Sequence, residues 1–238
     1  MRDYWLSLLR ETLEYGIDGI VLYFHRFHPF VAFEQPVIDA FQARFGEDPR
    51  QLAPDDPRWI THSAGYVTEF VRQARALANE YGRSLGVTFW AAPTGYDPTR
   101  EYDPIRYSCD VKTWIKDGLA DYYFPMSAIN MELVRELRAL GGPGLHIWPD
   151  LMPRTQPGEF FAKLARDYYA AGADGFCMND GERRTSRLSE WAVEKMLGHR
   201  ELLGQLEEEA KDYYRLEGLK YLMGYNTRFS FNNFGGDP

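Results

Sequence analysis

The chain has 238 residues, 45% of them hydrophobic and 26% charged, a composition typical of a globular protein with a sizeable core rather than a disordered chain. Its 27 basic and 35 acidic residues give a net charge of -8, so phosphate backbones and anionic membranes have no general attraction for it. The apolar runs are far shorter than the roughly 18 residues that span a bilayer, and two cysteines exclude a disulfide framework. We therefore expect no nucleic-acid partner and no membrane span.

Hydrophobic periodicity and glycine positions predict the elements in chain order. We expect a helix over 4–13, a strand over 20–24, an insertion over about 25–63, a helix over 66–81, a strand over 85–91, a short helix from about 110, strands over 122–124 and 145–148, a helix over 160–169, a strand over 176–178 and a C-terminal helix over about 189–216. The residues from 225 to 238 show no period.

A repeated unit supports this order: an amphipathic helix, a glycine, an acid within three residues, and an apolar run. Its glycine and acid occur as Gly16 and Asp18, Gly118 and Asp121, and Gly172 and Asp174. Glycine is typical of a helix end in the left-handed conformation, and a continuous apolar run of a strand buried on both faces. The alternation predicts a parallel sheet with right-handed crossovers.

Two α/β architectures fit, an open doubly wound sheet or part of a (β/α)8 barrel. A complete barrel has eight strands in about 250 residues, whereas this chain has five predicted strands. We therefore expect a partial (β/α)8 TIM-type barrel of about five parallel strands in residues 1–216, with the insertion at about 25–63 and a tail over 217–238.

Candidate functional residues follow the strands, because functional side chains of α/β repeats lie at the carboxyl ends. Glu34, Asp150 and Asp180 could supply the two carboxyl groups of glycoside hydrolysis. The alternative is that each acid caps a helix or pairs with an arginine. The residues that would position a sugar are His25, Arg26, Trp90, Tyr96, Trp148 and Asn179; for the aromatic ones, packing is the alternative.

Other chemistries have weaker support. His25 and His28 with Glu34 could form a metal site, which leaves a metal-dependent hydrolase as an alternative, but their spacing is not that of a helical ligand pair. Nucleotide-binding and serine-hydrolase motifs are missing from the sequence, so we expect no nucleotide cofactor. Cys109 and Cys177 are predicted to be small packing residues.

Several short motifs of this chain resemble motifs of a known family. They are Gly16 to Ile20, the group Arg26, Pro29, Phe30, Glu34 and Pro36, the stretch Phe45 to Pro49, the helical set Thr68, Phe70 and Arg72, and the set Asp110, Thr113, Trp114, Gly118, Leu119 and Asp121. On these residues the chain resembles the family-10-like glycosyl hydrolases, bacterial (β/α)8 glycosidases. The resemblance implies a carbohydrate substrate and no cofactor.

The same resemblance implies that the strands are the fourth to eighth of a barrel. It would then follow that a half-barrel upstream, or an oligomeric partner, covers the sheet edges, and that an upstream signal could direct export. Members often carry an acid within a Leu-Asp-Phe pattern, where this chain has Leu22-Tyr23-Phe24. That departure favours a second hypothesis, a carbohydrate-binding or scaffolding domain without catalysis.

Overall fold

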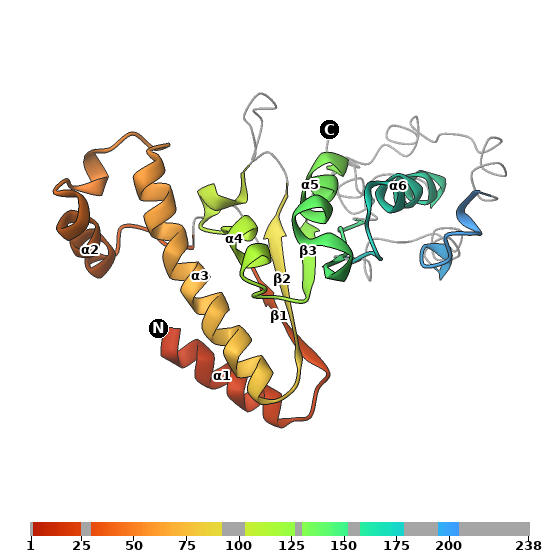
Figure 1. The fold of residues 1–238 in the computed structure, drawn as a ribbon, viewed down its shortest axis with the longest axis horizontal. Coiled ribbons are helices and arrows are strands. Elements are labelled where there is room, and N and C mark those ends of the chain that lie inside the picture. The colour runs from red at the N-terminus through yellow and green to blue at the C-terminus, as the bar shows by residue number, and fades with distance from the viewer. Residues whose placement is uncertain are drawn as a thin grey trace, which may run out of the picture. The chain divides into compact units, whose positions relative to one another are not determined.

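The computed structural model describes residues 2–24, 30–91, 103–126, 130–151, 158–178 and 195–204, with the backbone alone at 158–160. The chain divides into two compact units, Met1–His146 and Ile147–Pro238. The elements, drawn in Figure 1, are α1 (Arg2–Glu14), β1 (Gly19–Tyr23), α2 (Gln35–Phe45), η1 (Pro49–Gln51), α3 (Pro57–Glu80), β2 (Ser84–Trp90), η2 (Pro104–Tyr107), α4 (Val111–Lys116), β3 (Tyr122–Met126), α5 (Met131–Gly141), η3 (Gly142–Gly144), β4 (His146–Ile147) and α6 (Gly158–Ala171).

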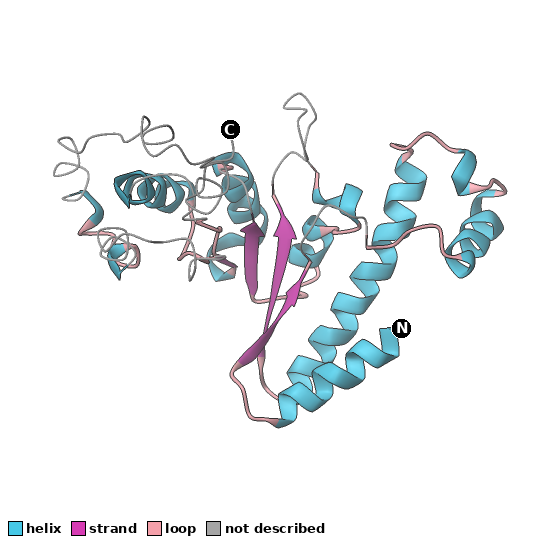
Figure 2. Cartoon of the chain, turned by 180° about the vertical axis from the view of Figure 1, so that it is seen from behind, coloured by secondary structure: helices cyan, strands magenta, loops and turns pink. Residues whose placement is uncertain are grey.

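Four strands form one sheet in the order β1-β2-β3-β4. β1 runs parallel to β2, with Gly19 opposite Ser84 and Tyr23 opposite Thr88, and β2 runs parallel to β3. Helices alternate with the strands along the chain, as Figure 2 shows by colour. The predicted α/β class, a sheet of parallel strands with alternating helices, is confirmed.

One face of the sheet packs against helices. Successive side chains of a strand point to opposite faces, and in β1 Ile20 and Leu22 are buried whereas Val21 and Tyr23 are about half exposed. α1 and α3 lie side by side and contact β1, and α3 also contacts β2. The sheet-facing side chains of α3 include Val67, Val71, Ala74 and Leu77. The core therefore lies between the sheet and these helices.

Trp114 joins α4 to this core. Its side chain is fully buried, and its indole N–H donates a hydrogen bond of 2.9 Å to the Thr68 hydroxyl on α3. The ring centroid lies 5.5 Å from that of Phe24, directly after β1. One residue thus contacts both α3 and the end of β1.

The glycines of the three repeats have the backbone conformation that the pattern predicts. Gly16, Gly118 and Gly172 have φ angles of 75°, 63° and 109°. An L-residue with a side chain rarely adopts this region, which glycine enters without cost. Each helix of the repeat therefore ends within two residues of its glycine.

The acid of the repeat binds the start of the preceding strand. Asp121, before β3, donates its backbone N–H to the Leu85 carbonyl at 2.8 Å, and its carboxylate accepts the Leu85 N–H at 2.9 Å. Asp174 makes the same two contacts with Ile147, both at 2.9 Å. Each acid thereby fixes the register of two neighbouring segments.

Two predicted elements differ from the structure. The fifth strand is reduced to a parallel bridge between Asp150 and Cys177, because Pro149 beside it has no N–H to extend the ladder. The predicted C-terminal helix is interrupted by turns at 197–202, where Gly198 is a poor helix former. The rest of that helix and the tail 217–238 lie outside the described residues.

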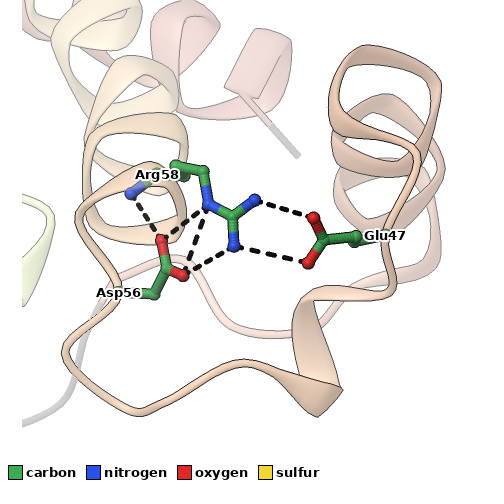
Figure 3. Close-up of polar contacts among 3 residues, drawn as sticks. All are labelled: Glu47, Asp56 and Arg58. Carbon is green, nitrogen blue, oxygen red and sulfur yellow. Dashed lines mark hydrogen bonds and ion pairs between the residues drawn. The ribbon is translucent and has the colours of Figure 1, made fainter.

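The insertion after β1 contains more structure than the sequence predicts. It holds α2, η1 and the first turns of α3, and Arg58 fixes the connection (Figure 3). Arg58 binds Asp56 at 2.8 Å and Glu47 at 2.9 Å. These hydrogen bonds, first to Asp56 and then to Glu47, raise the pKa of the Arg58 guanidinium, which therefore stays charged.

No helix among the described residues is long and apolar enough to cross a membrane.

Candidate functional site

In the second unit, the segment after β4 brings a carboxyl group to a strand end. Asp150 follows Trp148 and Pro149 and is only 5% exposed. The Cys177 N–H donates to the Pro149 carbonyl at 3.0 Å, and the Leu151 N–H donates to the Cys177 carbonyl at 2.8 Å. Two backbone hydrogen bonds therefore hold Asp150 opposite Cys177.

Trp148 and Asp150 are two residues apart in an extended segment, so both side chains point to the same face. The Trp148 indole lies against Gly175, where an added Cβ would come within 3.2 Å of the ring. A carboxyl group and an aromatic ring thus share one face of the 148–151 segment. That combination can transfer a proton and stack on an apolar ligand surface.

Cys177 is the neighbour of this carboxyl group. This cysteine is not among the site residues that the sequence predicts. Burial, and then the negative charge of Asp150, raises the pKa of the Cys177 thiol to about 11. The thiol is therefore neutral at physiological pH and is no nucleophile there. Burial also raises the pKa of the Cys109 thiol.

We expect Cys177 to react slowly with iodoacetamide. Because only the thiolate reacts, a shift of the pKa from 9.0 to about 11 predicts alkylation roughly 100-fold slower than for a free cysteine at pH 8. The rate should rise with pH up to about 11. Peptide mass spectrometry across pH 7–10.5 measures it. A rate that levels off below pH 9 would contradict the expectation.

In the first unit, the strand ends present aromatic residues on the face opposite the helices. Tyr23 is 54% exposed, and Trp90, at the end of β2, is partly buried beside Met126 of β3. Trp90 and Trp148 therefore both lie at strand ends, as the sequence predicts. Their role in binding remains a prediction.

Further rings cover the same face nearer the start of β3. Tyr122 stacks on His146 with centroids 4.7 Å apart and on Phe124 at 6.4 Å. A Cβ at Gly86 would lie 2.8 Å from the Phe124 ring and 3.1 Å from Val21. Gly86 thus allows Phe124 and Val21 to close over the sheet.

The structure places Glu34 at the start of a helix. It is the exposed residue before α2, and its side chain makes no capping hydrogen bond. Figure 1 shows α2 at the end of α3 that points away from α1. Asp110, by contrast, caps α4 by accepting the Thr113 N–H at 3.1 Å.

The remaining candidate residues lie outside the described residues: His25, Arg26, His28, Tyr96, Asn179 and Asp180. The structure describes no group of three potential metal ligands in the ranges that it covers. A metal site at His25 and His28 stays an untested alternative. The proximity of Cys177 to Asp150 could have been found from sequence, because the fourth and fifth predicted strands were neighbours in order.

Comparisons with known proteins give no family. No protein-family model and no curated relative matches the chain. A solved structure that matches is the crystal structure of an archaeal fructose 1,6-bisphosphate aldolase, at 14% identity and a TM-score of 0.35, covering 87% of this chain and 81% of that chain. The resemblance to the family-10-like glycosyl hydrolases is therefore wrong: no protein-family model matches the chain, and a solved structure that matches is described as an aldolase.

Proposed function

We propose that the protein hydrolyses glycosidic bonds of an oligo- or polysaccharide at the carboxyl ends of its parallel strands, with Asp150 as one of the two carboxyl groups. The observation that carries the proposal is the buried Asp150 carboxyl on the same face as the Trp148 indole. A sugar ring has apolar C–H faces that stack on indole, and its glycosidic oxygen needs a proton donor.

Hydrolysis requires a second carboxyl group. Asp180 is the candidate, because it follows the 176–178 segment that pairs with Asp150 and Leu151. One carboxyl would protonate the leaving oxygen, while the other would attack the sugar or activate a water molecule. Cys177, with a neutral thiol, would serve as a wall of the site.

Replacing Asp150 by asparagine tests this function. Loss of proton transfer should lower kcat by roughly 100-fold or more with little change in KM. The assay is the release of reducing sugar from a polysaccharide panel and of nitrophenol from aryl glycosides. Asp167→Asn, an exposed acid on α6, is the matched control.

Circular dichroism must show that Asp150→Asn is folded, because the side chain is buried. A folded Asp150→Asn protein with unchanged turnover would exclude Asp150. A wild-type protein without turnover on the full panel would exclude hydrolysis.

A second candidate is a carbohydrate-binding protein without catalysis. It is favoured by Tyr23, which stands exposed at the end of β1, and by the stacked rings of Tyr122 and His146. Isothermal titration with the same glycans separates the two. Binding without turnover, retained in Asp150→Asn, supports the binding protein.

A further inference from the structure

The insertion carries a stack of aromatic side chains whose outermost ring is open to solvent. Phe33, just before α2, lies on Trp59 of α3 with ring centroids 4.7 Å apart and 16° between the ring planes. Trp59 in turn meets Phe41 of α2 edge-on at 5.7 Å, and Phe41 is fully buried. Phe33 itself is 49% exposed. The stack thus runs from buried residues of the insertion to its surface, where it presents one planar ring.

The exposed ring has a fixed support. The His62 ring lies 6.0 Å from that of Trp59 and 5.3 Å from that of Phe41. Its Nε2 also lies 3.2 Å from the Val37 carbonyl oxygen on α2, within hydrogen-bonding distance. These contacts join α2 to α3 beneath the stack. Because the ring is positioned before any ligand arrives, binding there loses little conformational entropy.

Polar side chains follow Phe33 at the start of α2. The Gln35 amide donates from Nε2 to Oδ1 of Asp39 at 2.7 Å, and both residues are exposed. An amide and a carboxylate joined in this way keep further donor and acceptor positions. A sugar ring has an apolar C–H face and, at its edge, hydroxyl groups that both donate and accept. A planar ring followed by such a polar pair fits that chemistry.

The charges near the stack select among ligands. Within residues 30–40 the charged side chains are Glu34 and Asp39, both acidic and both exposed. Arg58, the residue before Trp59, is already paired with two carboxylates. Phosphate groups and other anions are therefore repelled from this surface, whereas a neutral sugar is not.

We propose that Phe33 and the Gln35–Asp39 pair bind one ring of a neutral oligosaccharide. The site uses residues of the first unit that take no part in the proposed cleavage. Its ligand class rests on the proposed function, because a protein that cleaves or binds a polysaccharide gains from a second hold on the same chain. Two linked contacts with one chain bind more tightly than either alone.

Titration of the full 238-residue chain with cello-, xylo-, chito- and malto-oligosaccharides, followed in amide NMR spectra, tests the inference. We expect one of these glycans to shift the Gln35 backbone amide. Phe33→Ala should raise the Kd measured from that shift by about 10-fold or more, because stacking on the ring is lost. Tyr15→Ala, which removes a ring that is 77% exposed after α1, is the matched control and should leave the Kd unchanged.

Two further variants separate stacking from packing. Phe33→Leu keeps an apolar side chain over Trp59 but has no planar ring, so it should lose binding as Phe33→Ala does. Phe33→Tyr keeps the ring and should bind as the wild type does. Wild-type affinity in Phe33→Leu overturns the inference, because the ring then serves packing alone. So does a Gln35 amide that no glycan shifts, or that shifts only with a proline-rich peptide.

Turnover distinguishes this inference from the proposed function. Nitrophenol release from aryl glycosides, which carry a single sugar, reports on the Asp150 site, and Phe33→Ala should leave it unchanged. A glycan-dependent shift of Gln35 that Phe33→Ala weakens, in a protein without turnover, supports the inference and excludes hydrolysis. Turnover without any such shift overturns the inference and leaves the proposed function in place.

Discussion

Replacing Trp114 by alanine is expected to lower the free energy of unfolding by about 4 kcal/mol, the range found when a buried tryptophan is truncated. The side chain is fully buried, contacts Phe24, and donates a hydrogen bond to Thr68. Truncation leaves a cavity between α3 and α4 and an unpaired buried hydroxyl. Urea unfolding followed by circular dichroism measures the change.

Two variants separate packing from the hydrogen bond. Trp114→Phe keeps most of the ring but removes the indole N–H that Thr68 accepts, so it should cost about 1–2 kcal/mol. Thr68→Val removes the acceptor and keeps the shape. A loss below about 1 kcal/mol for Trp114→Ala would show that this region is not packed as described.

Replacing Asp121 by alanine is expected to cost about 2 kcal/mol, the value for lost hydrogen bonds to a charged group with partial solvent screening. The carboxylate accepts the Leu85 N–H at 2.9 Å and binds Arg75, with Nη2 to Oδ1 at 3.0 Å. Its loss leaves a strand N–H and a half-buried guanidinium without their partner. Thermal unfolding at fixed protein concentration measures the effect.

Asp117→Ala is the matched control for this prediction. Asp117 also binds an arginine of α3, Arg72 at 2.7 Å, but no hydrogen bond joins its side chain to a strand among the described residues, and both side chains are more than 40% exposed. We expect a change below about 0.5 kcal/mol, as for exposed ion pairs. Equal losses for the two variants would mean that Asp121 acts only as a surface charge.

Local patterns predicted most of the first unit correctly. The glycine and acid of each repeat identified β1 and β3, because a positive φ and strand burial are properties of a few consecutive residues. The start of α3 was placed nine residues late, at 66 instead of Pro57. Asp56 followed by Pro57 is a helix-start pattern, and the Asp56 carboxylate accepts the Arg58 N–H at 2.8 Å.

α5 was missed because its apolar stripe is short. Only Leu133, Val134 and Leu137 of its residues are buried. Its first turn is defined by Asn130, whose side chain accepts the Leu133 N–H at 2.9 Å. A helix that begins with a side-chain cap and has so few buried residues gives only a weak hydrophobic period in the sequence.

The site was less predictable than the fold. Asp150 lies opposite Cys177, 27 positions along the chain. The order of the predicted strands makes the two segments neighbours, but the sequence does not give the register that places these two residues opposite each other. The motif residues behind the family resemblance have structural partners: Thr68 accepts from Trp114, and Arg72 binds Asp117. Such residues take part in helix packing that unrelated α/β proteins share, so they do not identify a family.

The length of α3 separates the insertion from the sheet. Its 24 residues extend about 36 Å at 1.5 Å per residue, whereas the seven residues of β2 extend about 23 Å. Because α3 ends where β2 begins, its first turns run on past the other end of the strand and carry α2 there. Two added or removed turns would shift α2 by about 11 Å and leave the sheet core unchanged. A change in the length of α3 would thus move α2 relative to the sheet without altering the core between the sheet and the helices.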